Sequence, residues 1–277
     1  MTTAFVLSGG ASLGAIQVGM AAALFDHGIR PDMIVGSSVG AVNGAWLAAE
    51  RPISGLTELW RSMRARDIFP LYPLAGWRGF SGRSANLVSN SGLRRLLKRN
   101  ITFAALEDFP IPLSVIVTEV STGAEVRLRH GPAIEAILAS AAIPGIFPPV
   151  VIDGRTFLDG GIVNNTPITQ AIEAGATDVW VLSTGYSCAL PTAPKSAIAM
   201  ALHGVTLLVQ QRLERETALR TYPVPVHLIP PPCPITVTPM DFSQSASLIE
   251  RARAGTVQWL ANGQPHALPL LGHHHPT

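Results

Sequence analysis

The amino-acid sequence predicts an α/β fold with a mostly parallel central sheet. Short apolar runs typical of buried strands alternate along the chain with helix-like segments. Glycine-rich turns directly follow the first two apolar runs, at residues 8–14 and 36–40. Hydrophobic residues make up 47% of the 277 residues and charged ones 14%, so the chain can bury a large core. We expect one domain over residues 1–262 and a flexible tail over residues 263–277.

The first half of the chain shows this alternation most clearly. Its expected strands are 4–7, 33–35, 112–118 and 124–129. Its expected helices lie near 15–27, over 41–50 and over 132–139. The last of these helices begins at Pro132, as suits a proline in a first helical turn. A strand, a tight turn and a helix therefore follow one another twice near the N-terminus.

The second half begins with a hairpin signal. Asp153-Gly154 separates two short apolar runs, and such a dipeptide is typical of a two-residue turn. Thr166 before Pro167 predicts the N-cap of a helix that ends at Gly175. Further strands are expected at 178–184 and 225–230, and long helices over 196–220 and 243–262.

Positive charge is concentrated in one segment of the chain. The formal net charge is only +2, which indicates no nucleic-acid partner. Between Arg51 and Arg99, however, ten basic residues stand against two acidic ones. Residues 67–92 are also rich in glycine, proline and aromatic residues, so residues 60–99 are a candidate lid insertion.

Two interpretations of this basic segment stay open. In the first, a solvated arginine face covers ordinary core aromatics. In the second, aromatic rings lie at the head-group depth of a membrane while basic side chains contact anionic lipid. The rings are those of Trp60, Phe69, Tyr72, Trp77 and Phe80, and the basic side chains are those of Arg94, Arg95, Lys98 and Arg99.

Cysteine content and the N-terminus bear on the compartment. Cys188 and Cys233 lie far apart in sequence, which predicts no disulfide framework, metal site or redox site. The N-terminal residues lack the basic region of a signal peptide, and no apolar run approaches the length of a membrane span. We expect a cytoplasmic protein that contacts at most the inner face of the membrane, with no cofactor and no metal.

The stretch GSSVG at residues 36–40 is a candidate nucleophile turn. Ser38 is the central residue of G-x-S-x-G, and the predicted strand–turn–helix context is the one this motif requires. The start of the following helix offers backbone N–H groups to a developing oxyanion. Ser37 does not occupy the motif position. Taken alone, the pentapeptide fits an ordinary small-residue turn equally well.

A base for Ser38 is harder to find. An α/β-hydrolase triad needs a histidine, but His203 interrupts an apolar helix and His227 lies in an apolar strand. Both are typical of structural histidines, and His273 to His275 fall in the expected tail. Asp159, in LDGG, ends an apolar run beside two glycines that allow close approach of another chain. A simple turn is the alternative interpretation of LDGG.

Four segments together resemble the patatin-like phospholipase family, whose members are serine acyl hydrolases with a Ser-Asp dyad and no histidine. The segments are LSGGASLGAIQVG (7–19), GSSVGAVNGA (36–45), ILASAAIPGIFPPV (137–150) and LDGGIVNNTPI (158–168), in the family's order. The resemblance implies a three-layer sandwich and hydrolysis of carboxyl esters of (lyso)phospholipids or related lipids. It also implies that Ser38 is the nucleophile and Asp159 its base, with Gly9, Gly10 and Ala11 as oxyanion-hole donors.

The first segment departs from the family pattern at two positions. Ala11 replaces a glycine, and a positive φ there would cost about 1–2 kcal/mol. Leu13 replaces a basic residue that could bind phosphate, which weakens the case for a phospholipid substrate. The alternatives are a lipid-binding pseudoenzyme with the same fold and a nucleotide-binding enzyme. The second is disfavoured because SGGASLG matches neither G-x-G-x-x-G nor a P-loop.

Overall fold

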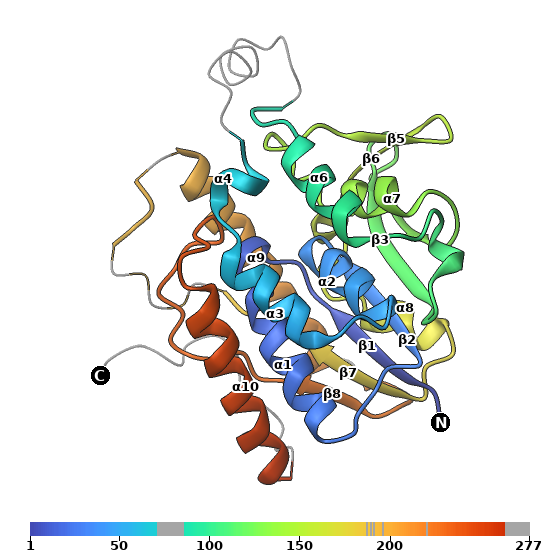
Figure 1. The fold of residues 1–277 in the computed structure, drawn as a ribbon, viewed down its shortest axis with the longest axis vertical. Coiled ribbons are helices and arrows are strands. Elements are labelled where there is room, and N and C mark those ends of the chain that lie inside the picture. The colour runs from blue at the N-terminus through green and yellow to red at the C-terminus, as the bar shows by residue number, and fades with distance from the viewer. Residues whose placement is uncertain are drawn as a thin grey trace.

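The fold is built around one mixed, mainly parallel sheet (Figure 1). The computed structural model describes all residues except 71–85, 187, 189, 191, 196, 220 and 264–277. The expected tail and three of the expected lid aromatics, Tyr72, Trp77 and Phe80, lie outside the described residues.

Within the described residues the sheet has eight strands, in the order β5-β6-β3-β2-β1-β7-β8, with β4 paired to β3. The parallel strands are β1 (Thr3–Leu7), β2 (Met33–Ser37), β3 (Leu113–Glu119), β7 (Asp178–Leu182) and β8 (Val226–Ile229). The antiparallel strands are β4 (Glu125–Leu128), β5 (Val150–Ile152) and β6 (Arg155–Asp159). The predicted hairpin at Asp153-Gly154 is confirmed as the β5–β6 turn.

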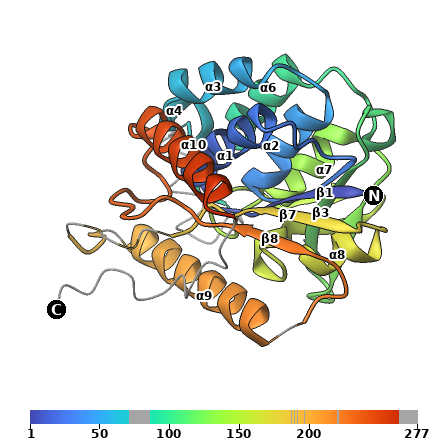
Figure 2. The ribbon, with the colours of Figure 1, turned by 90° about the horizontal axis from the view of Figure 1, so that it is seen from below.

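Helices cover both faces of the sheet, which confirms the three-layer α/β sandwich (Figure 2). One face carries α1 (Gly14–Asp26), α2 (Val39–Ala48), α3 (Ile53–Ser62), α4 (Ala65–Ile68), α6 (Ser91–Asn100), α7 (Ala133–Ser140) and α10 (Ser245–Ala261). The other face carries α8 (Ile168–Glu173) and α9 (Ala197–Leu219).

Alternation along the central strands divides the core between these two faces. In β1, Phe5 and Leu7 belong to the larger buried cluster, whereas Ala4 and Val6 belong to the smaller one. This is the period-2 pattern of a strand covered on both sides. The helices α1 and α10 pack closely because Gly19 has no side chain. A Cβ there would lie 2.2 Å from the Ile249 carbonyl oxygen.

One local expectation needs correction, and one of the two open interpretations of the basic segment loses support. Thr166 does not cap α8, because the N-cap position is Pro167 and no described residue bonds the buried Thr166 hydroxyl. Trp60 and Phe69 do not face outward as lid aromatics would. Both rings are buried in the larger core cluster, where Phe69 stacks on Phe147 at a ring-centroid distance of 5.2 Å.

Candidate active site

The turn between β2 and α2 holds Ser38 in a strained backbone conformation. Its φ and ψ are 54° and −125°, a region that costs a non-glycine residue about 1–3 kcal/mol. The Ser38 N–H donates to Ser140 Oγ at 2.8 Å, and Ser140 Oγ donates to the Ile116 carbonyl at 2.7 Å. A Cβ at Gly40 would lie 2.1 Å from the Leu7 carbonyl oxygen. The second glycine of GSSVG is therefore required by close packing against β1.

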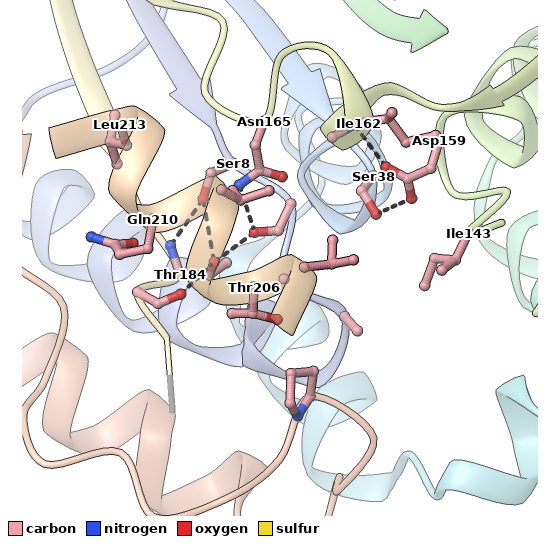
Figure 3. Close-up of a pocket in the computed structure, with 18 of the residues that line it drawn as sticks. Ser8, Ser38, Ile143, Asp159, Ile162, Asn165, Thr184, Thr206, Gln210 and Leu213 are labelled. Atoms are coloured by element: carbon pink, nitrogen blue, oxygen red, sulfur yellow. Dashed lines mark hydrogen bonds between the residues drawn. The ribbon is translucent and has the colours of Figure 1, made fainter. Parts of the chain in front are cut away.

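Asp159, at the end of β6, meets Ser38 across 121 residues of sequence. Ser38 Oγ donates to Asp159 Oδ2 at 2.7 Å (Figure 3). The other carboxylate oxygen accepts from the Gly161 N–H at 2.7 Å, and Thr118 Oγ1 donates to the Asp159 carbonyl at 2.8 Å. These bonds fix the carboxylate toward the serine hydroxyl. The geometry is that of a nucleophile and a base in contact.

Burial changes the protonation chemistry of this pair. Both side chains are 6% exposed. Loss of solvation raises the pKa of Asp159 from 3.8 to about 6, although the hydrogen bonds from Ser38 and Gly161 lower it in part. The carboxylate is thus a stronger base than an exposed aspartate and is still mostly ionised at neutral pH.

The glycine turn after β1 lies beside Ser38, and its N–H groups are not equivalent. The Gly9 N–H donates to the Asn165 carbonyl at 3.2 Å, so this donor is already engaged. Within the described part of the chain, no acceptor faces the N–H groups of Gly10 and Ala11. Ala11 has a φ of 49°, the positive value expected if alanine replaces a glycine without changing the loop. Of the three predicted oxyanion donors, only Gly10 and Ala11 are free.

Leu13 lies in the core and not at the site. Its side chain is fully buried in the larger hydrophobic cluster. The expectation that a basic residue at this position would help to bind phosphate does not fit this placement. A cation here would be surrounded by apolar side chains.

Two cavities meet at Ser38. The larger, of about 110 Å³, is bounded by the turn after β1, by Asp159 and by one face of α9. Its walls are mostly apolar, with a few uncharged polar side chains (Figure 3). The polar ones besides Ser38 are Ser8, Asn165, Ser183, Thr184, Thr206 and Gln210.

The smaller cavity, of about 60 Å³, is almost entirely apolar. Ser38 and Ala11 stand at one side of it, and its aromatic wall is formed by Trp60, Phe69, Phe147 and Phe242. Trp60 stacks on Phe242 at a centroid distance of 6.0 Å. A hydrocarbon chain fits such walls, because it leaves no polar group unpaired.

The remaining candidate residues lie away from Ser38. His227 Nε2 is 2.9 Å from Asp178 Oδ1, and its ring stacks on Trp180, which confirms a structural histidine. In the basic cluster, Arg94 forms a two-pronged ion pair with Glu135. The side chains of Arg95, Lys98 and Arg99 are exposed on α6.

The structure brings together one pair that the sequence analysis kept apart. Cys188 and Cys233 form no disulfide with each other, and their sulfur atoms are 3.3 Å apart. They follow β7 and β8, which are parallel neighbours, so the two loops leave the same edge of the sheet. The sequence analysis predicted no strand order, so it offered no signal for this approach. The sequence analysis also missed Ser140, although it lies within the segment 137–150, and Gln210, which belongs to a helix without a motif.

In the part of the chain that the structure describes, no helix has the length and apolar character needed to cross a bilayer.

Comparison with known proteins finds a matching family and several relatives of this chain. The sequence model of the patatin-like phospholipase family matches residues 5–172. The chain is 29% identical over 189 residues to neuropathy target esterase sws of Drosophila melanogaster. It is 32% identical over 191 residues to patatin-like phospholipase domain-containing protein 7 of Rattus norvegicus. These alignments cover 65% and 66% of this chain but 13% of each relative, so the chain spans a small part of their length.

Two further similarities extend this picture. An uncharacterised NTE family protein of Mycobacterium tuberculosis is 32% identical over 165 residues, which are 60% of this chain and 44% of that protein. Among solved structures, VipD of Legionella pneumophila superimposes with a TM-score of 0.50 at 17% identity. That match covers 94% of this chain and 67% of VipD, and it bears on the fold alone.

Proposed function

This chain belongs to the patatin-like phospholipase family, and on that premise we propose that it hydrolyses carboxyl esters of lipids with Ser38 as nucleophile and Asp159 as general base. The observation that carries the proposal is the 2.7 Å hydrogen bond from Ser38 Oγ to Asp159 Oδ2 at the meeting point of two cavities. Esters of (lyso)phospholipids or related lipids are the substrate class that the family suggests. The reaction needs no cofactor.

In the acylation step, Ser38 Oγ attacks the ester carbonyl carbon while its proton moves to Asp159. The tetrahedral intermediate then collapses, the proton passes to the leaving alcohol, and an acyl-enzyme remains. Water, deprotonated by the same carboxylate, attacks the acyl carbon and releases the fatty acid. Asp159 therefore serves as base and then as acid in each half-reaction, which suits a pKa raised toward neutrality.

Stabilisation of the oxyanion falls to backbone groups. The free N–H groups of Gly10 and Ala11 and the N-terminal end of α2, which begins directly after Ser38, are the candidates. Each well-placed donor is worth about 10²–10³-fold in rate. This contribution matters here, because aspartate is a weak base for a serine hydroxyl and proton transfer must accompany attack.

A lipid-binding pseudoenzyme is the alternative, and the replacement of glycine by Ala11 motivates it. The loop nevertheless keeps a positive φ at Ala11 and leaves the Ala11 N–H free. That geometry favours an active enzyme.

The substrate must reach this site from a lipid phase. Two large apolar residues at the larger cavity, Ile162 and Val205, are 45% and 51% exposed. On α6, Arg95, Lys98 and Arg99 form an exposed cationic row, while Arg94 is already paired. We propose that this row gives peripheral contact with an anionic membrane surface, to which each basic residue adds about 1 kcal/mol.

The decisive experiment compares two neighbouring serines. Ser38→Ala should lower kcat/KM for a p-nitrophenyl acyl ester by about 10³-fold or more. Ser37→Ala is the matched control, because the Ser37 hydroxyl is buried, has no hydrogen-bond partner among the described residues and faces neither cavity. Both purified variants should keep the wild-type circular dichroism spectrum. Retention of substantial activity by Ser38→Ala would refute the proposal.

A further inference from the structure

We propose that the larger cavity binds the alcohol portion of the substrate and selects an uncharged, oxygen-bearing alcohol of the glycerol type, with Gln210 as the residue that recognises it. This inference rests on the proposed function, since it names the substrate class of the same site. The inference predicts that the site prefers neutral acylglycerols to phospholipids.

Gln210 is the observation that starts the argument. It lies on α9, is 4% exposed and lines the larger cavity (Figure 3). Its side-chain amide nitrogen is buried and has no acceptor among the described residues. A buried donor without a partner is destabilising, and most such groups in folded proteins are bonded. A turn of the Gln210 side chain toward the cavity would bring this nitrogen within reach of a substrate oxygen, which would supply the missing acceptor.

The face of α9 that carries Gln210 is the one turned to the cavity. Val205, Thr206, Val209 and Leu213 line it too, at the spacing of one helical face. In Figure 3, Thr206, Gln210 and Leu213 lie on the opposite side of the cavity from Asp159. A ligand bonded to Gln210 would therefore extend from the reacting carbonyl at Ser38 along α9.

The charges around the cavity argue against a phosphate. Among the described residues that line it, Asp159 is the only one with an ionisable side chain. A phosphate placed there would lose its hydration, meet no cation and lie beside a carboxylate. Arg212, also on α9, lines a neighbouring cavity that shares five residues with this one, and its guanidinium bonds the Val163 carbonyl. A neutral hydroxyl, ether or ester oxygen pays none of these electrostatic penalties.

The smaller cavity is suited to bind the acyl portion of the substrate. Its aromatic and aliphatic walls suit the acyl chain that becomes attached to Ser38. This leaves the cavity with the uncharged polar groups for the alcohol. The unpaired amide of Gln210 and the lack of cationic side chains among the described lining residues then both favour a glycerol-type alcohol over a charged head group.

The test compares three substrates with the same acyl chain: a 1-monoacylglycerol, the corresponding ethyl ester and the corresponding lysophosphatidylcholine. The wild-type protein should hydrolyse the monoacylglycerol with the highest kcat/KM. Gln210→Met removes the donor at nearly constant volume. It should lower the ratio of kcat/KM for monoacylglycerol to that for ethyl ester by about tenfold.

The matched control is Gln211→Met, because Gln211 is the next residue on α9 and is exposed. It should leave the ratio at the wild-type value. Gln210→Leu provides a second variant should Gln210→Met fail to fold, and it should shift the ratio in the same direction. An unchanged ratio in a folded Gln210 variant, or a wild-type preference for lysophosphatidylcholine, overturns the inference.

The two proposals fail in different ways. If a fluorophosphonate labels Ser38 and all three esters are hydrolysed while the ratio does not respond to Gln210, only this inference falls. If no ester is hydrolysed and Ser38 is not labelled, the proposed function falls and takes this inference with it.

Discussion

Asp159→Asn should make the folded protein more stable at neutral pH while abolishing its activity. Burial raises the pKa of Asp159 from 3.8 to about 6. Since one pKa unit corresponds to about 1.4 kcal/mol, keeping this carboxylate ionised in the fold costs about 3 kcal/mol at pH 7. The folded protein binds more protons than the unfolded chain between these two pKa values. The contribution of Asp159 to the free energy of unfolding therefore falls as the pH rises from 3.8 to about 6.

Asparagine removes the buried charge and can keep both local hydrogen bonds. Its Oδ1 can accept from the Gly161 N–H, and its Nδ2 can donate to Ser38 Oγ, the reverse of the present Ser38–Asp159 bond. The gain in unfolding free energy should thus reach at most about 3 kcal/mol at pH 7 and shrink toward zero near pH 4.

The assay is urea unfolding of the wild-type and variant proteins at both pH values, followed by circular dichroism, with ester hydrolysis measured in parallel. Asp153→Asn is the control, because Asp153 is exposed in the β5–β6 turn and asparagine tolerates its positive φ. Its unfolding free energy should change little at either pH. A variant at Asp159 that is no more stable at pH 7 than the wild type, or equally stabilised at both pH values, would refute the reasoning.

Three further results are expected. The kcat/KM for a neutral ester should rise with pH through about 6 and then level off, because the Asp159 carboxylate must be ionised to accept the Ser38 proton; a profile already flat from pH 4 upward would contradict this. Leu13→Arg should lower the free energy of unfolding in urea by several kcal/mol, since Leu13 is fully buried among apolar side chains. Leu13→Met should lower it by less than about 1.5 kcal/mol. Wild-type stability of Leu13→Arg would show that the arginine side chain can reach solvent. Replacing Arg95, Lys98 and Arg99 by glutamine should reduce co-sedimentation with anionic vesicles, and added salt should release the wild-type protein; equal, salt-insensitive binding to neutral vesicles would exclude this row as the contact.

Much of the fold follows from local patterns. The apolar runs before GSSVG and SGGASLG predict strands because buried parallel strands are continuous apolar segments, and β1 and β2 lie where expected. The family resemblance, which the family match confirms, brought Ser38 and Asp159 into one hypothesis. The structure shows in addition that Ser38 and Asp159 are hydrogen-bonded and that the Gly9 N–H donates to the Asn165 carbonyl.

Other features depend on packing that no local pattern records. Gln210 lies in a helix that also exposes Leu208, so hydropathy alone does not tell which face of α9 meets the cavity. Trp60 and Phe69 lie among arginines in sequence, and only the contacts of Phe69 with Phe147 and of Trp60 with Phe242 reveal them as buried. Cys188 and Cys233 meet because β7 and β8 are neighbours in the sheet.

The central claim is that Ser38 is an activated nucleophile, and covalent labelling tests it most directly. The protein is treated with a fluorophosphonate at pH 7.5, digested, and its adduct located by tandem mass spectrometry. The account predicts one adduct, on Ser38, that forms far more slowly in Asp159→Asn and is absent from Ser38→Ala. Modification of another residue, or undiminished labelling of Ser38→Ala, would contradict it.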